Sequence, residues 1–456
     1  MPDALVGLDV GTSGVKGVAI DADGGVLATA EEEYPLSTPQ PGWAEQDPED
    51  WWQASQRVLA QLPEGPVGLS GQMHGLVVLG EHDEVLRPAI LWNDQRTGAE
   101  CAEIERRVGL VRLIELTGNR ALPGFTAPKL LWLQRQEPEV HARIRHILLP
   151  KDYVRFRLTG ERTIDAADAS GTLLFDVAHR RWSPEMCEAL DVPLRWLPSA
   201  HEATEVATAG DQAAGALGVG IVAPGVLSVV LGTSGVVFAV LPSYQPDPQA
   251  RVHVFCHAVP GTWHAMGVML SAAGSLAWLR RAVGAGYDAL DADAARWQPG
   301  VEGLLFAPYL AGERTPHADP DARAAFTGLS LRHDRGALAR AVLEGVAFGL
   351  RDSLELLRQL GVDATVGRVS GGGARSELWL RITASVLRLP LERVQLEEGA
   401  AYGAALLAGV RAGVFADAQD AVARCVRVRD RIEPEWDYEE HYARFRLLYP
   451  TLKELH

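Results

Sequence analysis

The sequence contains little cysteine, and its cysteines are not arranged to bind a metal. Among 456 residues there are four, Cys101, Cys187, Cys256 and Cys425, far apart and without a CxxC pair. This spacing argues against a zinc site, and so few thiols in so long a chain argue against a disulfide framework. We therefore expect four reduced thiols and a cytoplasmic protein.

An excess of positive charge is also missing. Lysine and arginine total 43 against 59 aspartates and glutamates, a formal net charge of −16. Such a surface repels nucleic acid and anionic lipid, so we expect neither nucleic acid nor a membrane as a partner. If a chain this acidic binds phosphate, backbone amides and a divalent cation would have to replace a basic patch.

Long hydrophobic runs are absent as well. Residues 212–246 carry no charge, but Gly, Ser, Thr and Pro interrupt them every few residues. A membrane span needs about 18 or more consecutive apolar residues, so this stretch predicts strands and turns of a buried sheet. The start, MPDALVGLDVG, shows neither the basic nor the apolar region of a signal peptide, and we expect none.

One strand–turn–strand pattern occurs twice. LVGLDV-GTSG-VKGVAI spans residues 5–20, and VLSVVL-GTSG-VVFAVL spans residues 226–241. A shared tetrapeptide is weak by itself, but the same context near the midpoint of the chain indicates duplication. We predict two similar α/β domains, residues 1–225 and 226–456, with the active site in the cleft between them.

Helical periodicity fills the intervals between these runs. Residues 48–62 follow Asp47 as a helix N-cap, and residues 335–360 and 376–389 end at Gly361 and Pro390. No low-complexity or linker-like segment separates the predicted domains. We therefore expect them to meet across a cleft rather than move independently.

The first GTSG turn has the composition of a phosphate-binding loop. Glycines let backbone amides approach a phosphate, and Thr12 and Ser13 add hydroxyl donors to Gly11. Asp9 lies just before the turn and would repel phosphate unless a cation lay between, which predicts Mg²⁺ held directly or through water. Lys16 adds a positive charge on the next strand. A plain hairpin with an ordinary strand-end aspartate remains the alternative.

Two further turns complete a nucleotide site. The second tetrad offers Gly232, Thr233 and Ser234, but Val230 replaces the aspartate, so we expect phosphate binding without metal. The turn SGGGARS at residues 370–376 leaves a flat backbone at Gly372, Gly373 and Ala374, against which adenine or ribose could lie. It lacks the spacing of Walker A or GxGxxG, and a simple tight turn is the alternative.

In this order, the three turns resemble the phosphate and adenosine motifs of actin-like (ribonuclease H-like) ATPases. GFTAPKLLWLQRQ at residues 124–136 and GLSLRHDRGALARAVLE at residues 328–344 resemble the two signatures of the FGGY carbohydrate kinases. Agreement continues through WAEQDPEDWW, LLPKDYVRFRLTG, GDQAAGALG, FCHAVPGTWH and PYLAGERTPH, so the resemblance covers almost the whole chain. SGQMHG and LWNDQRT resemble the xylulokinase branch.

This resemblance implies two actin-like ATPase domains, the first binding sugar and the second binding nucleotide. It also implies ATP-dependent phosphorylation of D-xylulose to D-xylulose 5-phosphate, with Mg²⁺. Sugar and ATP would be the partners, and a homodimer is left open. A kinase for another ketose or polyol such as ribulose or glycerol, an ATP-driven binding module, and an inactive sugar sensor remain as alternatives.

The family's catalytic aspartate corresponds to Asp211, which would take the proton from the sugar hydroxyl as general base. A helix start at the same place is compatible with that role. The family's sugar-binding positions fall on the motifs that contain Met73, His74, Trp92, Asn93 and Asp94, together with Asp211. Such side chains pair with hydroxyl groups, and an aromatic face covers the sugar carbons.

The approach to Asp211 departs from the family. Residues 198–210, PSAHEATEVATAG, are fewer than the family usually has there, as if a helix and a turn were missing. We expect residues 204–210 to form the strand that delivers Asp211. Either the edge of the first domain is trimmed here or a loop is missing from the sequence, and in both cases the local stability of this segment is in question.

Overall fold

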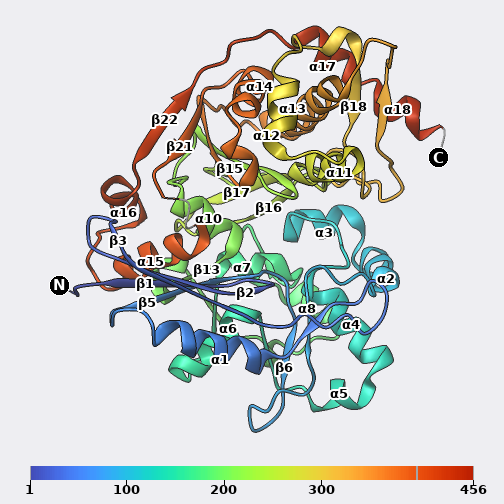
Figure 1. Ribbon diagram of the computed structural model, residues 1–456. Helices are drawn as coiled ribbons and strands as arrows, with labels where there is room; N and C mark the ends of the chain where they lie inside the picture. Colours follow the sequence, from blue (N-terminus) through green and yellow to red (C-terminus); the bar gives the residue numbers. More distant parts are fainter. Residues whose placement is uncertain (1, 397–398, 455–456) are drawn as a thin grey trace.

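The computed structural model describes residues 2–396 and 399–454 and contains two large β-sheets (Figure 1). The first has five strands in the order β13-β5-β1-β2-β3, and the second has seven in the order β16-β17-β15-β14-β20-β21-β22. The strands of the first sheet are β1 (Leu5–Val10), β2 (Gly14–Ile20), β3 (Val26–Glu33), β5 (Val67–Gly71) and β13 (Thr208–Gly210). Those of the second are β14 (Val226–Leu231), β15 (Gly235–Leu241), β16 (His253–Cys256), β17 (Trp263–Met269), β20 (Val366–Ser370), β21 (Leu391–Val394) and β22 (Val428–Ile432).

The two sheets share one topology. In the first, β1, β5 and β13 run parallel, and β2 and β3 continue antiparallel from β1. In the second, β14, β20 and β21 run parallel, and β15 and β17 continue antiparallel from β14. The repeated order and direction confirm the expected two-domain α/β fold.

Parallel pairing brings distant turns to a common edge. Val10 and Gly210 both pair with Gly71, so β1, β5 and β13 end together, next to Asp211. In the second sheet Val230 pairs with Ser370, so the second GTSG turn and the glycine-rich turn after β20 lie side by side. The carboxyl ends of parallel strands are where α/β proteins commonly bind ligands.

Helices cover both faces of the first sheet (Figure 1). On one face lie α1 (Pro48–Leu59) and α6 (Pro150–Thr159), and on the other lie α10 (Asp211–Gly218) and α15 (Gly399–Arg411). Helix α15 comes from the second half of the chain but packs on the first sheet so closely that a Cβ atom on Gly7 would lie 1.9 Å from the Ala401 carbonyl oxygen. The two halves therefore share a core.

The remaining helices and short strand pairs surround the two sheets. The helices are α2 (Gly98–Val108), α3 (Leu110–Thr117), α4 (Thr126–Gln136), α5 (Pro138–Arg143), α7 (Ala166–Ala169), α8 (Pro184–Ala189), α9 (Ala203–Val206), α11 (Ala273–Val283), α12 (Tyr287–Ala294), α13 (Arg335–Gln359), α14 (Glu377–Leu387), α16 (Ala418–Cys425), α17 (Glu439–Phe445) and α18 (Leu448–Lys453). Short strand pairs are β4 (Glu45–Gln46) with β7 (Ala89–Ile90), β6 (Val77–Leu79) with β8 (His146–Leu148), β9 (Thr163–Asp165) with β12 (Ser199–His201), β10 (Phe175–Asp176) with β11 (Arg181–Trp182), and β18 (Leu305–Ala307) with β19 (Ala325–Thr327).

The structure confirms the helices expected from periodicity and corrects one strand. Asp47 caps α1, its side chain accepting a hydrogen bond of 2.9 Å from the Glu49 amide. The predicted strand over residues 204–210 is wrong in its first half, because residues 203–206 form the one-turn helix α9 with a Glu202–Glu205 capping box. Only Thr208–Gly210 is strand. The capping box offers the local stabilisation that the short segment seemed to lack.

All four cysteines are free and buried, as expected from their spacing. Across residues 2–396 and 399–454, no helix is both long enough and apolar enough to cross a membrane.

Candidate active site

The carboxylates of Asp9 and Asp211 mark the centre of the candidate site. Asp9 is the fifth residue of β1 and pairs with Lys16 on one side and Ser70 on the other. Asp211 is the first residue of α10, directly after its N-cap Gly210. The structure therefore places Asp211 at a helix start, and this position also puts its carboxylate at the edge where β1 and β5 end.

These two carboxylates hold protons more tightly than usual. Burial raises the pKa of Asp211 to about 7, and the nearby charge of Asp9 contributes to the rise. Burial also raises the pKa of Asp9 to about 6, although the Ser70 side chain and then the charge of Lys16 oppose this. A carboxylate that titrates near neutral pH can both accept and release a proton under working conditions, which suits a general base.

Asp9 has a free coordination position for a cation. Within the described part of the chain, the buried Oδ1 atom of Asp9 has no hydrogen-bond partner. A buried, unpaired carboxylate oxygen is unfavourable by itself and is a preferred ligand of Mg²⁺. A divalent cation here would also relieve the repulsion between Asp9 and Asp211, so these residues fit the magnesium site predicted from the sequence.

A second group of carboxylates does not offer such a site. Asp152, Asp165 and Asp168 are fully buried around the Nζ atom of Lys151, at 2.5, 2.8 and 2.9 Å. The ammonium group already occupies the position in which a metal ion would sit. We interpret this cluster as a structural ion network beneath strand β13.

Side chains hold the first GTSG turn through its carbonyl groups. Gln46 Nε2 donates a 2.7 Å hydrogen bond to the Thr12 carbonyl, and Tyr34 and Gln72 donate to the Gly11 carbonyl. Thr12 keeps partial exposure and Ser13 is exposed. The sequence did not single out Gln46 or Tyr34, and it indicated Gln72 only as part of the predicted sugar motif. The two glutamines lie in the motifs WAEQD and SGQMHG, but nothing in the sequence pairs them with the turn.

The second and third turns form one surface. The carbonyls of Gly232 and Thr233 accept hydrogen bonds from amides at the start of α11, those of its N-cap and its first two residues. The Thr233 and Ser234 side chains are exposed. In the third turn Gly371 and Gly372 are exposed, whereas Gly373 and Ala374 are buried, Gly373 against Leu231 and Trp379. The open backbone of this turn therefore begins one residue earlier than the sequence predicts.

His74 has a defined orientation and protonation state. Its backbone is left-handed, with φ of 68°, and its Nδ1 lies 2.7 Å from the Gly171 carbonyl oxygen. Burial lowers the pKa of His74 to about 3, so the ring is neutral. Since Nδ1 must carry the proton to donate to a carbonyl, Nε2 is left as an acceptor for a hydroxyl group.

The three predicted sugar contacts on the loop after β7 differ in how accessible they are to a ligand. Trp92 is 43% exposed, and its Nε1 atom donates to the Thr12 hydroxyl at 2.9 Å. Asn93 has a buried Oδ1 atom without a hydrogen-bond partner among the described residues, which leaves it available to a ligand. Asp94 is fully buried, and Arg96 and the Ala44 amide occupy both of its oxygens. Asp94 thus holds the loop rather than presenting a free carboxylate.

Met73 and residues from the second half surround His74. Met73 is buried, and a Cβ atom on Gly210 would lie 2.9 Å from its Cγ, so its side chain packs against the end of β13, just before Asp211. The ring of Phe255 lies 6.0 Å from that of His74, and His253 Nε2 lies 3.5 Å from Arg314 Nη1. Sequence reasoning assigned no role to these second-half residues, because only the fold brings them to the first domain.

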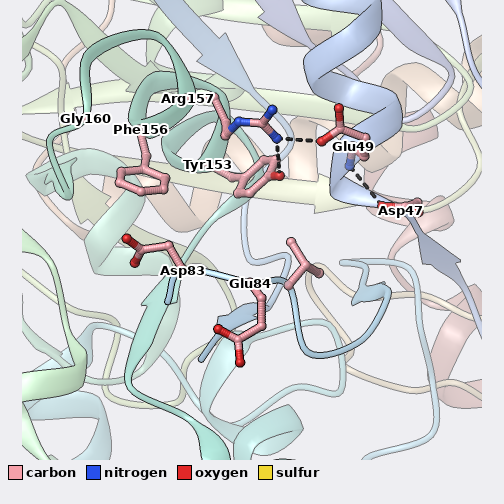
Figure 2. A pocket seen from close by; sticks show the side chains of 9 residues that line it. Asp47, Glu49, Asp83, Glu84, Tyr153, Phe156, Arg157 and Gly160 are labelled. Atoms are coloured by element: carbon pink, nitrogen blue, oxygen red, sulfur yellow. Dashed lines mark hydrogen bonds and ion pairs between the residues drawn. The ribbon is translucent and has the colours of Figure 1, made fainter. Parts of the chain in front are cut away.

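One hollow on the first domain lies away from these residues. A cavity of about 590 Å³ is lined by Asp47, Glu49, Asp83, Glu84, Val85, Tyr153, Phe156, Arg157 and Gly160 (Figure 2). It opens on the α1–α6 side, and Arg157 bridges Glu49 at 2.5 Å and Tyr153 at 2.7 Å. None of its lining residues belongs to the three turns or the predicted sugar contacts.

Comparison with known proteins identifies the family. Residues 4–241 match the N-terminal domain of the FGGY family of carbohydrate kinases, and residues 227–412 match its C-terminal domain. The chain belongs to the FGGY family of carbohydrate kinases. It is therefore a sugar kinase, a phosphotransferase whose family implies the use of ATP, and the binding-module alternative is set aside.

Relatives agree over nearly the whole length. A xylulose kinase from Escherichia coli (strain K12) is 44% identical over 436 residues, which are 89% of this chain and 90% of that protein. The crystal structure of a xyloylose kinase from Brucella ovis matches with a TM-score of 0.94 at 42% identity, covering 99% of this chain and 100% of that one. A xylulose kinase structure from Rhodospirillum rubrum matches with a TM-score of 0.92 at 32% identity, covering 99% of each chain.

Proposed function

We propose that this FGGY kinase transfers the γ-phosphate of ATP to D-xylulose, giving D-xylulose 5-phosphate. The observation that carries the proposal is the common strand edge, which sets the proton acceptor Asp211 next to Asp9 and close to the His74 loop. Relatives named xylulose kinase, at 35–44% identity, support the choice of sugar.

Asp211 is the general base in this proposal. Phosphoryl transfer demands positioning, charge neutralisation and one group that accepts the proton of the attacking hydroxyl. Asp211 begins α10 between Gly210 and a row of small residues, so a substrate can approach its carboxylate. Its pKa of about 7 lets it take that proton at neutral pH and release it afterwards.

The sugar is held by neutral groups in this proposal. His74 accepts a hydroxyl hydrogen bond at Nε2, Asn93 accepts one at Oδ1, and the exposed face of Trp92 covers the carbon skeleton. Asp94 contributes by holding the loop that carries Trp92 and Asn93, through its bonds to Arg96 and the Ala44 amide. Met73 packs against Gly171 and Gly210, next to His74.

The nucleotide lies against the three turns. Thr12 and Ser13 with Gly11, and Thr233 and Ser234 with Gly232, offer hydroxyls and backbone to phosphate, and Lys16 adds positive charge. The exposed backbone of the third turn, at Gly371 and Gly372, takes adenosine. Asp9 holds Mg²⁺ through its unpaired Oδ1, directly or through a water molecule. When bound there, the ion supplies the positive charge that the acidic chain lacks around phosphate.

A coupled assay with ATP and Mg²⁺ against D-xylulose, L-ribulose and glycerol tests the substrate. We expect the highest kcat/KM with D-xylulose. If L-ribulose or glycerol is phosphorylated far better, the site belongs to a kinase of the same family for another ketose or polyol.

A further inference from the structure

Lys129 is a fully buried lysine whose hydrogen bonds go to backbone carbonyls. It lies on α4, and its Nζ atom donates to the His74 carbonyl at 2.8 Å and to the Gly124 carbonyl at 2.7 Å. Within residues 2–396 and 399–454 it forms no salt bridge, in contrast to Lys151. Burial lowers the pKa of Lys129 well below its usual value. Burying an amine without a carboxylate partner is unfavourable, so we expect its two hydrogen bonds to serve a structural role that offsets this cost.

The role concerns the unusual backbone conformation of His74, whose carbonyl accepts one of these hydrogen bonds. A residue with a side chain avoids the left-handed region, yet His74 has a φ of 68°. Its carbonyl accepts from Lys129 and, at 3.0 Å, from the Thr126 hydroxyl, so two donors from one helix fix the peptide group in this orientation. Such local strain persists where surrounding contacts over-determine it and is common at ligand sites.

The ring of His74 is fixed as firmly as its carbonyl. Gly171 accepts the Nδ1 proton, and a Cβ atom on Gly171 would lie only 2.5 Å from His74 Cε1. Phe125 packs against the ring with centroids 4.5 Å apart. Among residues 2–396 and 399–454 the hydrogen bond of the imidazole is made by Nδ1, and Nε2 remains as its acceptor nitrogen.

We propose that Lys129 is a positioning residue for sugar recognition: with Thr126 it clamps the His74 carbonyl, and this clamp aims the imidazole Nε2 at a hydroxyl group of the sugar. The inference rests on the proposed role of His74 in binding sugar. It adds that helix α4, which lies outside the sugar-contacting motifs, sets the affinity of the enzyme for its sugar.

Steady-state kinetics of Lys129→Met tests the clamp. Methionine keeps most of the volume and removes the donor. We expect the KM for sugar to rise about tenfold or more, the scale of losing a hydrogen bond that orients a binding group, with the KM for ATP within about twofold of the parent value. Equal rises in both KM values would indicate general damage and overturn the proposal.

A double-mutant cycle shows whether Lys129 acts through His74. If it does, adding Lys129→Met to His74→Ala leaves the sugar KM of His74→Ala unchanged, because the aimed group is already gone. Additive increases would overturn the inference while leaving the sugar-binding role of His74 intact. If His74→Ala alone does not change the sugar KM, the proposed role of His74 fails instead.

Thr126 provides a matched pair if Lys129→Met does not fold. Thr126→Val removes the hydroxyl at constant shape, and Thr126→Ser retains it. We expect a several-fold rise in the sugar KM for the valine variant alone, since one of two donors to the His74 carbonyl is lost. Equal sugar KM values for the parent and both variants would overturn the inference.

Discussion

Trp92 and Thr12 are joined by a hydrogen bond of 2.9 Å from the indole Nε1 to the hydroxyl Oγ1. The Thr12 hydroxyl in turn donates to Gln72 Oε1 at 3.2 Å. A residue of the predicted sugar loop thus touches the first GTSG turn, the predicted phosphate loop, directly. Occupancy of one subsite can therefore affect the geometry of the other.

We expect Trp92→Phe to weaken ATP binding as well as sugar binding. The phenyl ring still covers the sugar carbons, but the Thr12 hydroxyl loses the donor that orients it. A rise of about threefold to tenfold in the KM for ATP is the scale of one hydrogen bond. Trp52→Phe, on α1 and outside the candidate site, is the matched control and should leave both KM values unchanged. An unaltered KM for ATP in Trp92→Phe would show that the contact has no role in nucleotide binding.

Activity should fall as the pH drops below about 7. A base with a pKa of about 7 is protonated below that pH and cannot accept the sugar proton, so kcat/KM for sugar follows the deprotonated fraction of Asp211. A pH profile between about pH 5.5 and 9 checks this. A flat profile across that range would argue against Asp211 as the titrating base.

Asp9→Asn should lower the pKa of Asp211. The negative charge of Asp9 disfavours a second charge nearby, and asparagine removes it at constant shape. Carboxyl-detected NMR titration of the nucleotide-free protein measures the shift without requiring activity. Glu49→Gln, which removes a carboxylate from the α1 surface, is the control and should leave the titration of Asp211 in place. An Asp211 pKa that does not move in Asp9→Asn would mean that burial alone raises it.

Asp211→Asn should abolish turnover and stabilise the fold above neutral pH. Losing a general base costs at least about 10²-fold in kcat. The native protein binds this proton more tightly than the unfolded chain, so stability is lost as the pH rises from the ordinary aspartate pKa of 3.8 to the raised pKa of about 7. By pH ~8 the penalty is complete, up to about 4 kcal/mol, and asparagine avoids it.

Unfolding of the parent and Asp211→Asn at about pH 4 and about pH 8 tests this sign. The gain should appear at the higher pH and be nearly absent at the lower one. Nucleotide binding should survive, since the three turns are untouched. Near-parental turnover in the variant would remove Asp211 from the mechanism.

Gly403→Ala should destabilise the protein by about 1–3 kcal/mol, the usual range for overpacking. A Cβ atom on Gly403 of α15 would lie 1.9 Å from the Ala214 carbonyl oxygen of α10. Because this oxygen belongs to the backbone, a side-chain rotation cannot relieve the clash. Because α10 begins at Asp211, we also expect kcat to fall. Gly98→Ala, at a helical glycine with nothing within 4 Å of an added Cβ, is the control and should be nearly neutral. Equal stability of the two variants would contradict the close packing of α10 and α15.

The sequence by itself determined the duplicated architecture and the sites of the three turns. Glycine and hydroxyl residues between apolar strands predict a turn from adjacent residues alone. The ends of α1, α13 and α14 are likewise predicted from capping residues and helix-stop residues next to them in the sequence. The family resemblance then located Asp211 and the His74 and Trp92 loops. These features depend on residues that are neighbours in the chain.

The tertiary structure alone decided which distant residues meet at the site. Parallel pairing of β1, β5 and β13 set Asp9 beside Asp211 and raised both pKa values, and packing brought Phe255 and Arg314 of the second half toward His74. It also showed that Asp94 is occupied by Arg96 and that Lys129 holds the His74 carbonyl. No periodicity or spacing encodes these contacts, because burial, charge proximity and hydrogen-bond geometry arise only when segments up to hundreds of residues apart pack against one another.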